Sequence, residues 1–356
     1  MADFLVIGGG IAGLSAGARL AELGSVHLLE RETQTGYHAS GRSAALFEES
    51  YGLPTTVALN RASHDELKAA GVLRPRGLLL VGSRGTAAAF AADMKAMHLT
   101  PVTPAEAAGL CPILDPVRVD RAGYDEAAWD IDTHALMTRF TQAIRANGRV
   151  QTGAEVTGIA REAGRWRVSL EGGEVLEAEV LVNAAGAWAD GVAAMAGVAP
   201  LGLTPLRRSM ARVAAPQGMS PARWPMVMGP GEDWYMKPDA GALIVSPAEE
   251  DPAEPHDAWA DDMVLAEGIA RFEAHVTMEV TRLLSSWAGL RTFAPDRQLV
   301  LGPDPDAPAF LWCAGQGGYG FQTSCAASRV LASHVGGAAE VEPGVVDALR
   351  PDRLRG

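Results

Sequence analysis

The first thirty residues constrain the fold more than any other part of the chain. An apolar run at residues 4–7 leads into glycines that fit the spacing G-x-G-x-x-G, namely Gly8, Gly10 and Gly13. An alanine-rich segment follows, and a second apolar run ends on Glu30. This order predicts a strand, a tight turn, a helix and a second strand, in which the glycines let a dinucleotide pyrophosphate approach the helix N-terminus. Glu30 stands where an acid accepts the ribose hydroxyls.

The composition is that of a globular protein large enough for two domains. The chain has 356 residues and a formal net charge of −13. That charge repels a phosphate backbone, so no nucleic-acid partner is expected. No apolar run reaches about 18 residues, and the N-terminal run lacks a basic flank, so we expect neither an integral membrane segment nor a signal peptide. The expected location is cytoplasmic, with at most peripheral contact at the inner face of the membrane.

The cysteines give no sign of a metal site. Cys111, Cys313 and Cys325 are odd in number and show no CxxC or Cys/His spacing. The simplest interpretation is three buried, reduced thiols.

The dinucleotide-binding pattern returns later in the chain, with other material inserted between its parts. Residues 262–285 have the spacing of an amphipathic helix, and an apolar strand at 310–314 leads into a second glycine-rich turn and helix. These patterns predict an α/β (α+β) fold, with a Rossmann-like βαβ domain and a substrate-binding domain built on a mixed or antiparallel sheet. The expected boundaries are 1–75, 140–200 and 285–356 for the first domain, and 76–139 and 201–284 for the second.

Three features together favour FAD over a nicotinamide cofactor. Arg31 follows Glu30, and a long polar loop then replaces an immediate return to a parallel strand. Residues 180–188, VLVNAAGAW, read as a strand that ends in small residues able to pack on a dinucleotide. Residues 315–324, GQGGYGFQTS, place a second helix N-terminus whose dipole would face the flavin pyrimidine, where negative charge gathers on reduction.

These motifs resemble those of the D-amino acid oxidase and glycine oxidase superfamily of FAD enzymes. Within that superfamily the chain is most similar to bacterial D-amino acid dehydrogenases of the D-arginine dehydrogenase type, nearly from end to end. The likeness rests on GYHASGRSAA (36–45), YDEAAWDIDT (124–133), VNAAGAW (182–188), PLRRS (205–209), WYMKPDAG (234–241), WAGLRTF (287–293) and GQGGYGFQTS (315–324).

The resemblance implies oxidation of a D-amino acid to its imino acid, by hydride transfer from Cα to flavin N5. The imino acid then hydrolyses to the 2-oxo acid and ammonia. Positioning of the substrate supplies much of the rate of such a reaction, and planar guanidinium groups suit a carboxylate. The matching positions are Arg208 and Arg291 for carboxylate-binding arginines, Tyr235 for a tyrosine on the same carboxylate, Tyr51 for a lid tyrosine, and Gly289 and Gly318 for carbonyls that hold the amino group.

Each of these residues also has an ordinary structural interpretation. An arginine beside an apolar run is often a surface ion-pair partner, and Tyr235 could be a core aromatic with a satisfied hydroxyl.

The expected FAD contacts come from the motifs and from the resemblance. They are Gly8, Gly10, Ile11, Ala12, Gly13, Glu30, Arg31, Gly41, Arg42, Ser43, Ala44, Ala45, Val156, Ala185, Gly186, Trp188, Gly317, Tyr319, Gly320, Phe321, Gln322 and Thr323.

The chain departs from the D-arginine-type pattern at the position of a substrate-binding acid. Relatives that prefer D-arginine carry a glutamate near the start of the strand after the first helices, whereas this chain has Arg76, Gly77 and Leu78. A buried guanidinium without a partner costs several kcal/mol, so we predict a preference for neutral, apolar D-amino acids over D-arginine. Glu48 lies in the segment 46–54, here called the lid loop, and could pair with a basic side chain in place of the missing glutamate. Basic substrates therefore stay an alternative.

A second departure is Leu46, where relatives carry a histidine. An imidazole there could assist proton transfer or substrate orientation, and with Leu46 that help is absent. Hydride transfer needs only a neutral amine, which solvent can provide. A substrate of altered shape is the other interpretation, and the sequence does not decide between them.

Covalent attachment of the flavin, as in sarcosine oxidases, needs a cysteine near WAGLRTF, and none is present. We therefore expect non-covalent FAD. The rival hypotheses are a glycine or sarcosine oxidase-like amine oxidase that uses O2 and a non-catalytic FAD-binding module. The electron acceptor, a quinone or O2, is left open.

Overall fold

The computed structural model describes residues 2–355, and its strands form three sheets within that range. The first sheet has a parallel centre in the order β12, β1, β2, β9, and β20 extends it parallel to β12. Its strands are β1 (Ala2–Ile7), β2 (Val26–Leu29), β9 (Gly148–Gln151), β10 (Val156–Glu162), β11 (Arg165–Leu170), β12 (Val175–Asn183), β19 (Val300–Pro303) and β20 (Phe310–Ala314).

Two glycines fix the turn between β1 and the first helix. Gly8 has φ +111°, and a Cβ there would lie 2.3 Å from the carbonyl oxygen of Ala184. A Cβ on Gly13 would lie 1.9 Å from the carbonyl oxygen of Gly8, so only glycine lets the helix approach the strand this closely.

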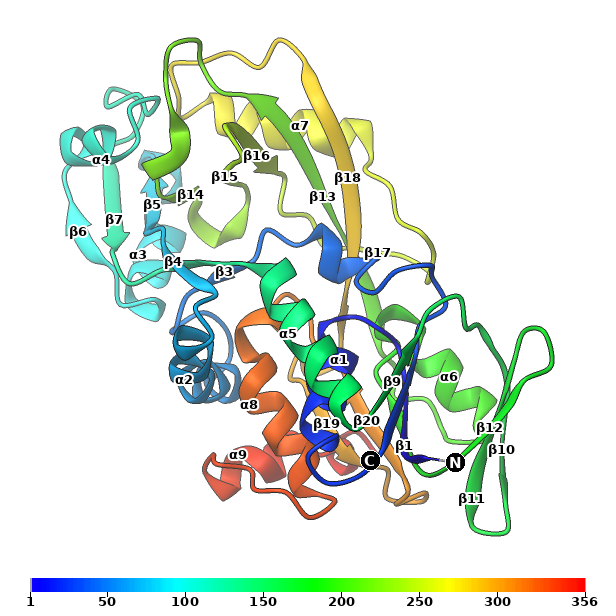
Figure 1. Cartoon of the computed structure of the whole chain (residues 1–356). Helices are drawn as coiled ribbons and strands as arrows, with labels where there is room; N and C mark the ends of the chain where they lie inside the picture. The colour runs from blue at the N-terminus through cyan, green and yellow to red at the C-terminus, as the bar shows by residue number, and fades with distance from the viewer. Residues whose placement is uncertain (1, 356) are drawn as a thin grey trace.

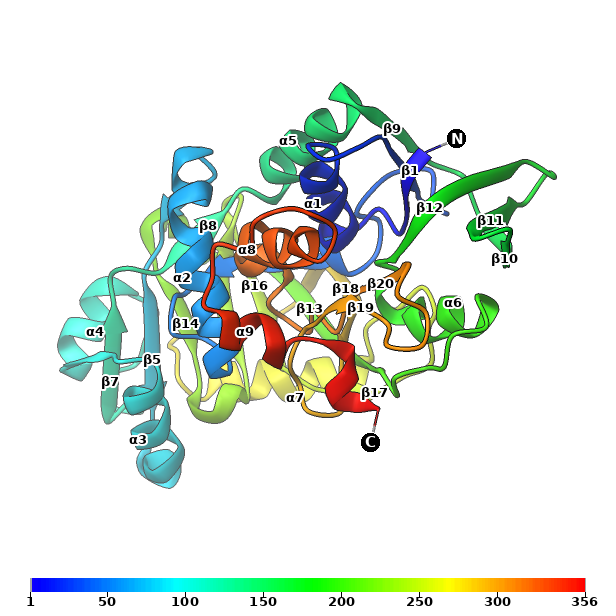
Figure 2. The same ribbon diagram turned by 90° about the horizontal axis from the view of Figure 1, so that it is seen from below.

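Helices from four distant parts of the sequence pack together on one face of this sheet. Helix α1 contacts α5 and α8, and α8 contacts α2 (Figure 2). The helices of the protein are α1 (Ile11–Leu20), α2 (Pro54–Ala69), α3 (Ala87–Ala96), α4 (Pro104–Leu110), α5 (Thr133–Ala146), α6 (Ala189–Met195), α7 (Asp262–Glu273), α8 (Gly320–Ser333) and α9 (Pro343–Ala348). Single 3-10 turns lie at η1 (Ala39–Arg42), η2 (Arg84–Thr86), η3 (Gly186–Trp188), η4 (Pro221–Arg223), η5 (Pro230–Glu232) and η6 (Pro351–Leu354).

The second sheet is larger and mostly antiparallel. Its two long strands, β13 and β18, pair along their whole length and run down toward the N-terminal segment (Figure 1). The strands are β5 (Leu78–Gly82), β6 (Thr100–Val102), β7 (Arg121–Asp125), β13 (Thr204–Ala214), β14 (Met226–Met228), β15 (Tyr235–Asp239), β16 (Ala242–Ser246), β17 (Asp251–Pro252) and β18 (Leu283–Phe293). A small third sheet joins β3 (Leu46–Phe47), β8 (Trp129–Ile131) and β4 (Leu73–Pro75).

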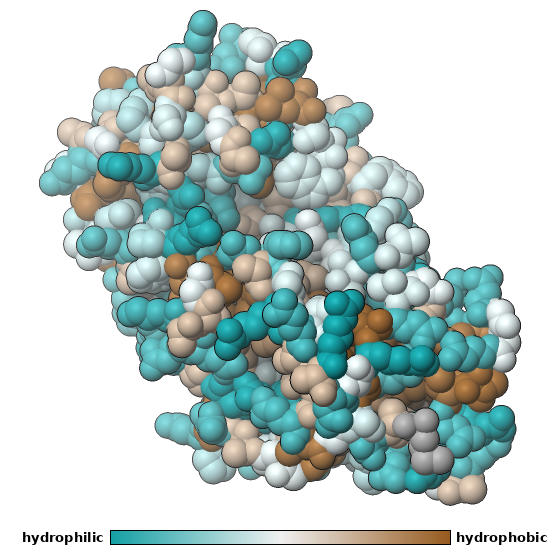
Figure 3. Space-filling model, in the orientation of Figure 1, coloured by the Kyte–Doolittle hydropathy of each residue, from teal (hydrophilic) through white to brown (hydrophobic). Residues whose placement is uncertain are grey.

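The two faces of the second sheet have different roles. On one face Ala211 and Val213 pack in a core that includes Leu265 and Phe272 of α7. Because side chains alternate along a strand, Arg208 and Met210 face the other way, toward the first sheet. The outer surface shown in Figure 3 is mostly hydrophilic, and its apolar residues lie in small separate spots, as is usual for a surface exposed to water.

The predicted α/β class is confirmed by the mixed sheets and their helices. Both large sheets draw on separated stretches of sequence, while the division into two domains with the boundaries given above stays a prediction. The helix expected over 262–285 is wrong beyond Glu273. The carboxylate of Glu273 accepts a hydrogen bond from the amide of Val280 at 2.6 Å, and Val276 forms a β-bridge with Leu114. β-Branched residues favour this extended pairing over a longer helix.

Candidate active site

A cavity of about 430 Å³ lies where the parallel strands of the first sheet end. Ile7, Leu29 and Ala314, the last residues of β1, β2 and β20, all line it. This edge of an open α/β sheet is the usual place for a nucleotide. The expected FAD contacts that line the cavity are Gly8, Gly10, Ile11, Ala12, Glu30, Arg31, Arg42, Ser43, Val156, Ala185, Gly186, Trp188, Gly317, Gly320 and Phe321.

Other expected FAD contacts lie elsewhere. Ala44, Ala45 and Gln322 line a second cavity described below, and Gly13, Gly41, Tyr319 and Thr323 line neither cavity. Gly13 packs on Gly8, and a Cβ on Gly41 would lie 2.4 Å from the carbonyl oxygen of Gly36. The Thr323 hydroxyl donates to the carbonyl of Tyr319 at the start of α8. These four residues shape the turns around the site.

Glu30 is held at one end of the first cavity by backbone amides. Its Oε2 accepts from the amide of Gly9 and its Oε1 from the amide of Glu32, each at 2.8 Å. Arg31 stacks on the Trp188 ring, 4.5 Å from its centroid. A carboxylate fixed beside a glycine turn and a helix N-terminus fits the ribose and pyrophosphate of FAD.

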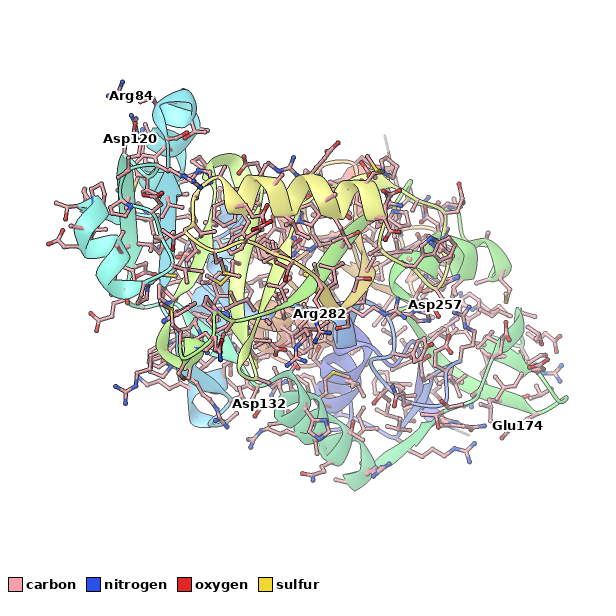
Figure 4. All side chains as sticks on the ribbon, turned by 90° about the horizontal axis from the view of Figure 1, so that it is seen from above. Arg84, Asp120, Asp132, Glu174, Asp257 and Arg282 are labelled. Carbon is pink, nitrogen blue, oxygen red and sulfur yellow. The ribbon has the colours of Figure 1, made fainter. Side chains whose placement is uncertain are left out.

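The sequence assigned no role to Ser40, which it offered only as part of the motif GYHASGRSAA, and gave no signal for Asp257. The Ser40 hydroxyl accepts from the amide of Ile11 at 2.9 Å, at the N-terminus of α1. Asp257, on the segment between β17 and α7 (Figure 4), forms an ion pair with Arg42 and accepts from the Tyr37 hydroxyl at 3.2 Å. Arg42 also donates to the carbonyl of Ala258 at 2.8 Å, so this segment of the second sheet is fastened over the nucleotide cavity.

The strand register brings the two expected carboxylate-binding arginines to one face. Arg208 of β13 lies opposite Gly289 of β18, and Arg291 lies opposite Leu206. Directly opposed residues share a face, as do residues two apart on one strand. Arg208, Gly289 and Arg291 therefore point to the same side, and both arginines line both cavities.

Arg208 is buried with unused hydrogen-bonding capacity. It is 3% exposed, its Nη2 lies 3.3 Å from Glu250 Oε1, and its Nε and Nη1 have no partner within residues 2–355. Burial, and then the charge of Arg291, lower its pKa. Burial also acts to lower the pKa of Arg291, but Tyr235, Tyr51 and Glu232 outweigh it and raise that pKa. Such a pair is poised to accept an anion.

The second cavity, of about 80 Å³, opens beside the arginines under the lid loop. The Tyr51 hydroxyl donates to Glu232 Oε2 at 2.9 Å, which joins the loop to the 3-10 turn η5. Tyr235 directs its hydroxyl toward Met210 Sδ at 3.2 Å. The expected catalytic residues on this cavity are Leu46, Glu48, Tyr51, Arg208, Tyr235, Arg291 and Gly318, while Gly289 lines the first cavity.

The far wall of the second cavity is apolar and was largely unforeseen. Leu78 lies there, at the position that has no acid in this chain, together with Met97, Met226 and Met228. Arg76 does not enter the cavity, because its guanidinium is held by Asp130, 2.7 Å from Nε. Glu232 was also missed, since it belongs to a turn without any motif.

Comparison with known proteins agrees with this geometry. Residues 3–334 match the family model described as FAD dependent oxidoreductase (DAO). The FAD-dependent oxidoreductase domain-containing protein 1 of Bos taurus is 24% identical, over 94% of this chain and 81% of that protein. The L-proline dehydrogenase structure from P. horikoshii has a TM-score of 0.84 at 20% identity, covering 99% of this chain and 97% of that one.

The glycine oxidase structure from Geobacillus kaustophilus has a TM-score of 0.81 at 22% identity and covers 96% of both chains. These structural likenesses show the fold. They do not single out the D-arginine-type dehydrogenases, since the solved structures include enzymes named for L-proline and glycine. Within residues 2–355 the structure has no helix of the length and apolarity needed to cross a bilayer.

Proposed function

Because this chain belongs to the FAD dependent oxidoreductase (DAO) family, we propose that it is a flavoenzyme that oxidises D-amino acids. The observation that carries the proposal is the pair Arg208 and Arg291 on one sheet face, at the junction of the two cavities. A flavin held only as a structural element would not need two guanidinium groups beside it. A substrate carboxylate supplies the anion that they lack.

The cofactor is FAD, which the residues of the first cavity would hold and which would supply the hydride acceptor for the substrate Cα. In the proposal Arg208 and Arg291 bind the carboxylate, with the Tyr235 hydroxyl beside them. The carbonyls of Gly289 and Gly318 accept from the amino group. This fixes the Cα–H bond toward the flavin, and positioning of this kind lowers the barrier without a dedicated base. The amine must be neutral, and solvent takes its proton, because the lid loop has Leu46 where relatives have histidine.

The residues that line the second cavity favour a substrate with a neutral, apolar side chain. Leu46, Leu78, Met226 and Met228 would contact the methylene groups of D-leucine or D-methionine, and burial of such groups is favourable by about 0.8 kcal/mol for each one. D-Arginine should be the poorer substrate. If D-arginine exceeded these amino acids by about tenfold in kcat/KM, or 1.4 kcal/mol, the preference would be refuted.

The remaining parts of the proposal concern the flavin linkage, the acceptor and the location. Cys313 lines the first cavity, but burial raises its pKa to about 12, which keeps it a thiol and supports non-covalent FAD. Release of yellow colour into the filtrate after denaturation is the expected result. A quinone or O2 takes the electrons, and we propose a cytoplasmic location for the enzyme.

Anaerobic bleaching of the flavin tests the central claim. The purified holoenzyme is mixed with D- and L-leucine, D- and L-methionine, D-arginine, glycine and sarcosine, and the visible flavin absorption is followed. Bleaching by D- but not L-amino acids is expected. Bleaching by glycine or sarcosine, with peroxide formed in air, would favour an amine oxidase instead. A bound flavin that none of these compounds reduces would indicate a non-catalytic module.

A further inference from the structure

Glu48 lines the second cavity and has one carboxyl oxygen without a hydrogen-bond partner among residues 2–355. Its side chain follows β3 and is 4% exposed. Oε1 accepts from the amide of Ser50 at 3.0 Å, and Oε2 is buried without a hydrogen-bond partner among residues 2–355. A buried polar atom left in this state costs free energy, so its position in a substrate cavity calls for a ligand.

The two charges that act most on Glu48 are of its own sign. Those that act on it belong to Asp125 of β7 and to Glu49, and both disfavour the ionised carboxylate. Burial has the largest effect and outweighs the opposing hydrogen bond from the Ser50 amide, and together with these charges it raises the pKa of Glu48 to about 7. The second acid of the cavity, Glu232, differs because it accepts the Tyr51 hydroxyl at 2.9 Å and its charge acts on Arg208 and Arg291.

The cavity therefore has two chemically different ends. Arg208 and Arg291 line its junction with the flavin cavity, whereas Glu48 lines the second cavity alone. The same cavity is also lined by apolar side chains, among them Leu46, Leu78 and Met226. An amino acid whose carboxylate is held by the arginines would direct its side chain along these walls toward Glu48.

We propose that Glu48 is the specificity-determining residue for the substrate side chain. When ionised it pairs with a terminal ammonium group, and when protonated it lets the same cavity take a neutral side chain of equal length. This inference rests on the proposed function, because it presumes a carboxylate at the arginines. It also limits the predicted preference for apolar over basic substrates to the pH range in which Glu48 is protonated.

The pH should therefore shift the choice between cationic and neutral substrates. An ammonium group supplies the cation that Glu48 lacks, and a charge-assisted hydrogen bond in a closed cavity is stronger than one in water. The other polar groups near Glu48 are the side-chain amide of Asn60 on α2, which donates to the Glu48 carbonyl at 3.4 Å, the side-chain amide of Gln322 on α8, whose Oε1 accepts from the Glu48 backbone amide at 3.4 Å, and the Tyr51 hydroxyl, which donates to Glu232. None of these three groups is a cation that could replace the substrate.

The test compares D-lysine with D-norleucine, which is D-lysine without its ammonium group. The ratio of their kcat/KM values is measured on the holoenzyme between about pH 6 and 8.5, where the D-lysine ammonium stays charged. Ionisations of the α-amino group and of the flavin act on both substrates and cancel in the ratio. The ratio should rise about tenfold as Glu48 ionises through this range.

Two variants of the lid loop locate the effect. In Glu48→Gln the ratio should be low and independent of pH. In Glu49→Gln, which alters an exposed neighbour paired with Arg61 at 2.9 Å, the rise should remain and begin at a lower pH, because the Glu49 charge helps raise the pKa of Glu48. Flavin content and absorption spectra show whether each variant is folded, and if Glu48→Gln loses FAD the wild-type profile alone decides.

A pH-independent ratio in the wild-type enzyme, with D-norleucine oxidised, would overturn this inference and leave the proposed function standing. A rise retained in Glu48→Gln would overturn it as well, because another group would then be responsible. Oxidation of neither compound also overturns it, and the bleaching panel then shows separately whether the proposed function fails with it.

Discussion

The guanidinium of Arg291 lies directly against Gly318, so that a Cβ atom on the glycine would be 2.8 Å from Nη1 and 2.9 Å from Cζ. Arg291 belongs to the second sheet, and Gly318 to the turn before α8 on the first. The contact therefore helps to fix the position of the Arg291 guanidinium beside the flavin cavity. Gly318 does not have a positive φ, so the contact with Arg291, and not the backbone conformation, is what requires a glycine here.

We predict that Gly318→Ala displaces the Arg291 guanidinium without unfolding the protein. The methyl group would overlap Nη1 and Cζ and press on Nε at 3.3 Å, so the guanidinium must shift away from Gly318. KM for the amino acid should rise about tenfold, or 1.4 kcal/mol, with FAD retained. Steady-state kinetics and flavin content measure this. The control is Gly344→Ala in α9, where a Cβ would meet nothing within 4 Å, and equal KM values for both variants would contradict the prediction.

Arg208→Met should raise the stability of the protein and weaken its binding of substrate. The buried guanidinium has two unpartnered nitrogens, and burial followed by the charge of Arg291 lowers its pKa, so its charged form destabilises the fold at neutral pH. Replacing a buried ion pair with apolar groups is often stabilising by about 1–4 kcal/mol, whereas removing one partner is costly when the other is left buried and unpaired. Glu250 would keep its ion pair with Arg297 at 2.8 Å.

We therefore expect Arg208→Met to raise the melting temperature of the holoenzyme while KM rises about a hundredfold, which corresponds to a lost charge-assisted contact of roughly 3 kcal/mol. Thermal unfolding and kcat/KM are measured on the same preparation. A lower melting temperature with unchanged KM would mean that Arg208 is a structural ion-pair partner of Glu250.

Local sequence predicted the nucleotide half of the site better than the substrate half. Gly13 and Glu30 act through contacts within one βαβ unit, so their spacing in the sequence predicts those contacts directly. The arginines were found only through a resemblance, because their proximity depends on the register between β13 and β18, which are far apart in sequence.

Other parts could not be read from spacing at all. Ser40 and Glu232 reach the site from turns whose positions are set by tertiary packing. The helix expected over 262–285 failed after Glu273 for a similar reason. The apolar spacing continues past that point, but pairing of Val276 with Leu114 makes an extended chain more favourable.

Lys237 should act as a positioning residue for the segment between the cavities. It is 8% exposed on β15, donates to the carbonyl of Ala44, and lies 2.8 Å from Asp130 Oδ1. The next residue, Ala45, has φ +46°, a left-handed conformation that costs about 1–3 kcal/mol and needs support. Lys237→Met removes that support and leaves Asp130 paired with Arg76 alone.

The expected result for Lys237→Met is weaker FAD binding and a loss of about 1–3 kcal/mol of stability, because a buried carbonyl and part of a carboxylate lose their partner. Fluorescence of released flavin and thermal unfolding measure the two effects. Lys68→Met, on the exposed side of α2, should change neither. FAD affinity equal to that of wild type would show that the segment is held by other contacts.

Glu48 should make the stability of the protein depend on pH near neutrality. Burial, and then the charges of Asp125 and Glu49, raise its pKa from an ordinary 4.5 to about 7, so the folded state favours the protonated form. This contribution is complete below about pH 4.5 and is lost as the pH rises through about 7. Relative to wild type, Glu48→Gln, which cannot ionise, should therefore gain roughly 3 kcal/mol of stability between about pH 4.5 and 8.

Unfolding of wild type and Glu48→Gln across this pH range measures the difference. Glu49→Gln, at an exposed position, should keep most of the wild-type pH dependence, reduced only by the loss of the Glu49 charge that helps raise the pKa of Glu48. A constant difference for Glu48→Gln would mean that the carboxyl group is already ionised in the folded protein.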